Sequence, residues 1–197
     1  MRDDFLEILA LYDESNLIYV DEVGFNVTLR IRTGRSFRGT REVHVVAGLR
    51  SRNVSVCCAI SKTGIINFQV QTIPYNTETF TASINTLLEP IANRGPSVII
   101  MDNVPFHKAR QIRGIIESRS HLLLSLPPYS PFLIPIENMF VIWKQSIRQS
   151  RPLDEEDLIK LINNVDNVTS PDDCALYYRH MFRFIPRCNN REAIVDE

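Results

Sequence analysis

The chain has 197 residues, of which 44% are hydrophobic and 23% are charged, a composition typical of one globular domain. No apolar run approaches the ~18 residues of a membrane-spanning helix, and the acidic N-terminus does not resemble a secretory signal. The four cysteines, Cys57, Cys58, Cys174 and Cys188, lack metal-ligand spacing, so we expect no zinc site, no disulfide scaffold and a reducing compartment.

The net charge of −1 is unevenly distributed along the chain. Residues 1–150 carry 16 Lys and Arg against 13 Asp and Glu, whereas residues 151–197 carry 6 against 10. A cluster of arginines in the first part is opposed only by Glu42, and is either a phosphate-contacting segment or a solvated loop. Its members are Arg30, Arg32, Arg35, Arg38, Arg41, Arg50 and Arg52.

The first half of the chain predicts one helix followed by short strands. Residues 4–12 predict a helix with acidic residues in its first turn. A β-branched and aromatic run then predicts a buried strand that ends at Asp21. Residues 30–41 predict an irregular loop or a loose hairpin. Strands are expected at residues 17–21, 43–46, 53–60 and 64–70, the last two joined as a hairpin.

The second half predicts alternating helices and strands. A second buried strand, residues 97–102, ends at Asp102, and a rigid proline-rich loop spans residues 127–131. Early strands joined by a hairpin and later ones joined by helices indicate an α/β fold, a mixed sheet with helices on both faces. Helices are expected at residues 76–93, 106–117, 135–149, 153–168 and 171–184, and a further strand at 122–124.

Three acidic residues stand where chemistry is expected in such a sheet. Asp21 and Asp102 end buried strands, and ligands of α/β sheets commonly gather at the carboxyl ends of strands. Glu137 is the third residue of a helix that begins at Pro135, so its side chain points back toward the preceding loop. Carboxylates without a His or Cys cluster suit Mg²⁺ or Mn²⁺, and two such ions can activate and stabilise the oxygens of a phosphodiester.

Three segments of the sequence resemble the signature blocks of the mariner-like DDE transposases. They are YVDEVGFN at residues 19–26, MDNVPFH at 101–107 and LPPYSPFLIPIEN at 126–138. Asp102 and Glu137 are separated by 34 residues, a spacing typical of one branch of that superfamily. The resemblance covers residues 16–150 clearly and the C-terminal helices more loosely.

The resemblance implies a ribonuclease H-like fold and a metal-dependent DNA strand transferase. Water would cut the ends of a transposon, and the freed 3′-hydroxyl would attack target DNA. Asp21, Asp102 and Glu137 match the catalytic, metal-binding triad of the family. Asp21 would bridge two Mg²⁺ or Mn²⁺ ions, and the other two residues would each hold one. Asn103 and His107 are expected to support the site rather than to bind metal.

Further residues are candidates for binding nucleic acid. Lys144 and Arg148 follow Glu137 along one helix face and would lie along a DNA strand that leaves the site. The segment with Arg30, Arg32, Arg35 and Arg38 corresponds to a loop of the family that contacts DNA or a partner subunit. Tyr129 is either structural or a DNA contact. The opposite helix face is expected to belong to the core, with Ile136, Met139, Phe140, Trp143 and Ile147.

The sequence departs from the family in two respects. Ile134 stands where the family usually has Asn, whose side chain caps the helix that carries Glu137. We expect Ile134 to lose the cap, about 1 kcal/mol of local stability. Family members also carry N-terminal helix-turn-helix modules, and only 20 residues precede Asp21 here. We therefore expect a catalytic domain alone, with residues 1–150 as its core and residues 151–197 as a helical extension.

Three functions remain open from the sequence. The first is an active transposase catalytic domain acting on double-stranded DNA, at transposon ends and target, as a homodimer in the nucleus, either alone or with a separate DNA-binding subunit. The second is an inactive or domesticated transposase relic that binds DNA or protein. The third, which the proline-rich block disfavours, is another ribonuclease H-like nuclease acting on RNA–DNA hybrids or Holliday junctions.

Overall fold

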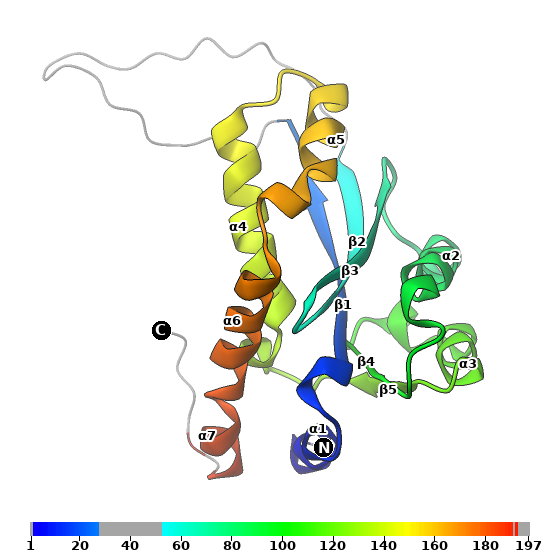
Figure 1. The fold of residues 1–197 in the computed structure, drawn as a ribbon. Helices are drawn as coiled ribbons and strands as arrows, with labels where there is room; N and C mark the ends of the chain where they lie inside the picture. Colours follow the sequence, from blue (N-terminus) through cyan, green and yellow to red (C-terminus); the bar gives the residue numbers. More distant parts are fainter. Residues whose placement is uncertain (1, 28–52, 191, 193–197) are drawn as a thin grey trace, which may run out of the picture.

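A computed structural model describes residues 2–27, 53–190 and 192 and shows a central sheet covered by helices (Figure 1). Its five strands are β1 (Leu17–Phe25), β2 (Val54–Ser61), β3 (Gly64–Gln71), β4 (Val98–Met101) and β5 (Leu122–Ser125). Its α-helices are α1 (Arg2–Leu11), α2 (Thr77–Leu87), α3 (Arg110–Ser118), α4 (Pro135–Ser150), α5 (Glu155–Asn163), α6 (Pro171–Phe182) and α7 (Ile185–Asn189).

The sheet has the strand order β3-β2-β1-β4-β5 and is mixed. The strands β1, β2 and β3 pair antiparallel, with β2 and β3 joined by the predicted hairpin, whereas β4 is parallel to both β1 and β5. Antiparallel neighbours can be joined by tight turns, but parallel neighbours need a crossover, and α3 connects β4 to β5 in this way. The mixed α/β fold predicted from the order of the elements is confirmed.

Strand side chains alternate between two hydrophobic layers because successive residues of a strand point to opposite faces. Leu17, Tyr19, Val23 and Phe25 of β1 belong to a large cluster that includes residues of α1, α4, α5, α6 and α7. Ile18 and Val20 belong instead to a second cluster with α2 and α3. Figure 1 shows α4 and α6 on one side of the strands and α2 and α3 on the other. This alternation decides which face each acidic residue of β1 occupies.

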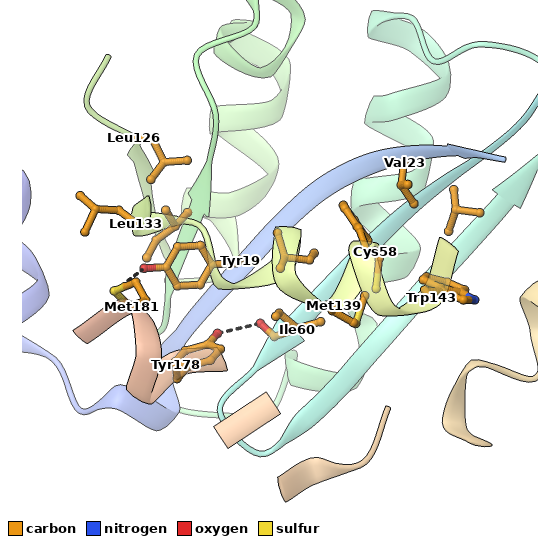
Figure 2. Close-up of a cluster of buried hydrophobic side chains, with 14 of the residues drawn as sticks. Tyr19, Val23, Cys58, Ile60, Leu126, Leu133, Met139, Trp143, Tyr178 and Met181 are labelled. Atoms are coloured by element: carbon orange, nitrogen blue, oxygen red, sulfur yellow. Dashed lines mark hydrogen bonds between the residues drawn. The ribbon is translucent and has the colours of Figure 1, made fainter. Parts of the chain in front are cut away.

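The larger layer is built around aromatic side chains (Figure 2). Trp143 of α4 is fully buried, with its ring centre 5.2 Å from that of Phe25. The buried Tyr178 of α6 donates its hydroxyl to the carbonyl oxygens of Leu17 (2.8 Å) and Ile60 (3.1 Å). The C-terminal helices therefore share one core with the sheet, although the boundary at residue 150 stays a prediction.

Most predicted elements are found, with shifted ends. The helix expected over 76–93 stops at Leu87 and continues as a short 3₁₀ turn, because Pro90 cannot extend an α-helix. The helix expected over 106–117 is split into a 3₁₀ turn, Pro105–Lys108, and α3. A prediction that ended the last helix at residue 184 missed α7. The loop expected over 30–41 and the strand over 43–46 lie outside the described residues.

Two further findings concern membranes and cysteines. Within the described ranges, no helix has both the length and the apolar character needed to cross a bilayer. All four cysteines are free thiols in buried positions.

Candidate functional site

Two parallel strands bring Asp21 and Asp102 to the same level of the sheet. β1 and β4 pair through Leu17 with Val98 and Tyr19 with Ile100. Continuing that register by two residues places Asp21 opposite Asp102, which directly follows β4. The register agrees with the prediction that the two acids lie side by side, but the prediction that the first strand ends at Asp21 is wrong. β1 continues to Phe25 because it stays paired with β2, so Asp21 lies in mid-strand and only Asp102 follows a strand end.

Glu137 approaches this edge from the first turn of α4. Pro135 is the first residue of the helix, and the Glu137 amide donates to the carbonyl oxygen of Ile134 (3.2 Å). Ile134 makes no capping hydrogen bond with its side chain, as predicted. Its side chain is partly buried against the larger hydrophobic layer, and this packing offsets part of the missing cap.

The negative charges around Asp21 change its protonation. Burial, together with repulsion from Glu22, Glu137 and Asp102, raises the pKa of Asp21 to about 8. A hydrogen bond from the Glu22 amide to Asp21 Oδ1 (2.8 Å) acts in the opposite direction but is outweighed. The two other triad carboxylates thus lie close enough to Asp21 to repel its charge. Such a cluster favours a cation or a bound proton.

His107 links two carboxylates from different strands. Its Nδ1 lies 2.5 Å from Asp102 Oδ1, and its Nε2 lies 2.9 Å from Glu22 Oε1. The imidazole is 1% exposed. Burial lowers its pKa, but the hydrogen bonds to Asp102 and Glu22 outweigh burial and raise the pKa to about 9. At neutral pH, both ring nitrogens are therefore protonated and each can donate to one carboxylate.

The loop after β4 is tied down on both sides of Asp102. Asp102 Oδ1 accepts a hydrogen bond from the Val104 amide (3.1 Å), and the His107 amide donates to the Val104 carbonyl oxygen (3.1 Å). The Asn103 side chain donates to the carbonyl oxygen of Leu126, the residue that follows β5. Asn103 and His107 therefore both hold this loop, and their support of a metal site stays a prediction.

Comparison with known proteins decides the family. A profile described as DDE superfamily endonuclease matches residues 16–160, which is most of the chain. The chain belongs to the DDE superfamily endonucleases. No curated protein matches by sequence.

Solved structures support the same fold for this DDE superfamily chain. A pre-cleavage Mos1 transpososome has a TM-score of 0.82 at 16% identity, covering 100% of this chain and 63% of that one. A Mos1 mariner paired end complex with Mn has a TM-score of 0.78 at 17% sequence identity, and the match covers 100% of this chain and 62% of that one. The catalytic domain of Mos1 mariner transposase has a TM-score of 0.69 at 15% sequence identity, and the match covers 98% of this chain and 94% of that one. The chain thus has the ribonuclease H-like fold of that domain and spans about three-fifths of the transposase chains in the DNA complexes.

The donor chemistry of this DDE site fits divalent metal ions. Asp21, Asp102 and Glu137 supply only carboxylate oxygens, and the charge repulsion at Asp21 would be relieved by a cation. However, within the described part of the chain no three His, Cys, Asp or Glu side chains are already arranged to hold one ion. The triad carboxylates are near one another but must adjust their side chains to share metal ions.

The remaining candidate residues, those predicted to bind nucleic acid, differ in their exposure to solvent. On α4, Arg148 is exposed and Lys144 is half-buried, while the opposite face of the helix is buried as predicted. Tyr129 is 95% exposed and has a left-handed backbone with φ of 55°, so its ring has no packing role. Four other predicted DNA contacts, Arg30, Arg32, Arg35 and Arg38, fall outside the described residues.

Sequence reasoning missed Glu22. It lies next to Asp21 in the first signature block, but a carboxylate beside a candidate ligand has no distinguishing spacing of its own. The signal available was strand alternation, which sends adjacent residues to opposite faces. Only the packing of the loop after β4 under β1 reveals that His107 meets Glu22 there.

Proposed function

We propose that the chain is the catalytic domain of a DNA transposase that hydrolyses phosphodiester bonds at transposon ends and joins the freed 3′ ends to target DNA. The proposal is carried by one observation: in a DDE superfamily chain, the charges of Asp102 and Glu137 act on the partly buried Asp21 in the middle of β1. A concentration of unneutralised carboxylates is costly for a fold and useful for binding cations.

In this proposal, Asp21, Asp102 and Glu137 would hold two Mg²⁺ or Mn²⁺ ions. When bound, such ions supply Lewis-acid activation of the attacking oxygen and charge stabilisation of the leaving oxygen. The Mos1 structures named as containing Mn or Mg support this metal preference by analogy. The role of the protein is to fix the carboxylates on two inner strands of the sheet and on helix α4.

The DNA path would run from the triad along α4. Lys144 and Arg148 lie C-terminal to Glu137 on this helix, and their charges suit a phosphate backbone. We propose that Arg30, Arg32, Arg35 and Arg38 contact DNA or a partner subunit. The names of the Mos1 complexes, a transpososome and a paired-end complex with a transposon end, support double-stranded DNA as the partner. A homodimer, a separate DNA-binding subunit and a nuclear location complete the proposal.

Nicking of DNA tests the proposal. The purified chain would be incubated with supercoiled plasmid carrying candidate transposon ends, in Mn²⁺ and in EDTA. We expect Mn²⁺-dependent open circles from the wild type and none from Asp102→Asn or Glu137→Gln. The matched control is Glu7→Gln, an exposed carboxylate of α1, which should nick like the wild type. Equal nicking by the triad variants and the wild type would refute the assignment of the triad.

A second candidate function is a non-catalytic relic that binds DNA or protein. The uncapped start of α4, the helix that carries Glu137, favours it. Under this alternative, no Mn²⁺-dependent nicking occurs and the triad substitutions leave DNA binding unchanged. An RNA–DNA hybrid in the same assay tests the third function, since preference for the hybrid over duplex DNA would contradict a transposase.

A further inference from the structure

The two adjacent acidic residues of β1 lie on opposite faces of the sheet. Asp21 stands between Tyr19 and Val23, whose side chains belong to the layer beneath α4. Glu22 alternates with them and pairs across β2 with Cys57, which belongs to the layer beneath α2 and α3. Glu22 therefore points away from the face on which Asp21 and Glu137 meet, a poor position for a fourth metal ligand.

On that second face, Glu22 contacts the imidazole of His107. The ring stacks on Phe80 of α2, with ring centres 4.4 Å apart and planes tilted by 34°. Phe80 is fully buried, so one side of the imidazole is held by a rigid wall. The bond to Glu22 Oε1 (2.9 Å) then fixes the rotation of the ring in its own plane.

Once the ring is fixed, the position of Asp102 follows. Nδ1, the other donor of the imidazole, lies 2.5 Å from Asp102 Oδ1, the oxygen that also accepts from the Val104 amide. The ion-pair contact with His107 and the hydrogen bond from the Val104 amide therefore both restrain this oxygen. Side chains that orient a ligand through a histidine in this way commonly govern metal affinity.

We propose that Glu22 is a positioning residue, which holds the His107 ring so that the ring in turn holds the Asp102 carboxylate ready for metal binding. The inference rests on the proposed function, because it assumes that Asp102 binds Mg²⁺ or Mn²⁺. It adds a fourth carboxylate to the site, one that acts through His107 and not on the ion.

Metal affinity without DNA tests this role. Free Mn²⁺ would be counted by electron paramagnetic resonance during titration of the folded protein. We expect Glu22→Ala to weaken Mn²⁺ binding by about 10–100-fold, the range typical of residues that orient metal ligands. Glu22→Gln keeps an oxygen acceptor for the ring and should restore affinity to within a few-fold of the wild type. Glu22→Asp, whose shorter side chain cannot keep the contact, replaces Glu22→Ala if the latter fails to fold.

A double variant shows whether Glu22 acts through His107. In a His107→Gln background, Glu22→Ala should cause no further loss of Mn²⁺ affinity. The matched control is Glu14→Ala, which removes another ion-paired carboxylate, bonded to Lys62 at 2.5 Å, and should bind Mn²⁺ like the wild type.

The outcomes separate the inference from the proposed function. Wild-type Mn²⁺ affinity in Glu22→Ala would overturn the inference but not the proposed function. The same holds if Glu22→Ala loses as much Mn²⁺ affinity in the His107→Gln background as in the wild-type background. If Glu22→Gln loses as much Mn²⁺ affinity as Glu22→Ala, then Glu22 acts through its charge or binds the ion itself. That result would also overturn the inference. Absence of Mn²⁺ binding by the wild type itself would contradict the proposed function, and the inference with it.

Discussion

Replacing the central carboxylate of the triad should stabilise the metal-free protein. The pKa of Asp21 is about 8 in the folded chain and 3.8 in the unfolded reference, because burial and three neighbouring carboxylates oppose its ionisation. The folded state therefore binds the proton more tightly than the unfolded state. Stability that depends on this proton is complete below pH 4 and is lost as the pH rises toward 8. Asp21→Asn removes this loss.

The size of the effect follows from the pKa difference. Each unit corresponds to about 1.4 kcal/mol, so the raised pKa of Asp21 lowers the free energy of unfolding by up to about 4 kcal/mol between pH 4 and pH 7. Relaxation of the site and the polar amide of Asn reduce the gain, and we expect about 2–4 kcal/mol. For a chain of this length, that raises the melting temperature by roughly 5–15 °C.

Urea unfolding in EDTA at several pH values between 4 and 8 measures the prediction. The difference in unfolding free energy between Asp21→Asn and the wild type should be near zero at pH 4 and should grow steadily to pH 8. Glu7→Gln, which removes an exposed carboxylate, should show no such growth. A variant whose stability parallels that of the wild type across the range would refute the argument that Asp21 is held at a cost to the fold.

Three further predictions concern the fold. Trp143→Ala should destabilise the protein by about 3–5 kcal/mol in urea unfolding, because the fully buried indole leaves a cavity; a loss below about 1 kcal/mol would contradict its central position. Tyr178→Phe should cost about 1–3 kcal/mol, since the carbonyl oxygens of Leu17 and Ile60 lose a buried donor; an unchanged denaturation midpoint would count against this bridge. Ser170→Ala should lower the free energy of unfolding by about 1 kcal/mol, because it removes the capping box of α6. Thermal unfolding measures this loss, and a stability equal to that of the wild type would argue against the cap.

The sequence predicted the layers of the fold because short hydrophobic patterns determine them. The runs that became β1 and β4, and the buried stripe of α4 with Trp143, have periodicities that allow little choice. Helix ends were less predictable. Pro90 could have been recognised as the stop signal of α2, whereas α7 is a five-residue helix without a periodic pattern of its own.

The candidate site was predictable only in part. Asp21 and Asp102 could be expected together because each follows a short apolar run that forms one of two neighbouring parallel strands, and the signature blocks added Glu137. The bridge from Glu22 through His107 was not predictable, because it depends on how the turn Pro105–Lys108 packs beneath β1. Contacts of that kind join residues far apart in the chain and carry no local pattern.

The thermal response to Mn²⁺ tests the central claim most directly, because a ligand that binds only the folded state raises its melting temperature. The account predicts a rise with increasing Mn²⁺ for the wild type and for Glu7→Gln, and none for Asp102→Ala. Since duplex DNA can contribute to metal binding, the titration is run with and without it. A folded wild type that shows no rise at millimolar Mn²⁺ under either condition would contradict a metal-dependent site at Asp21, Asp102 and Glu137.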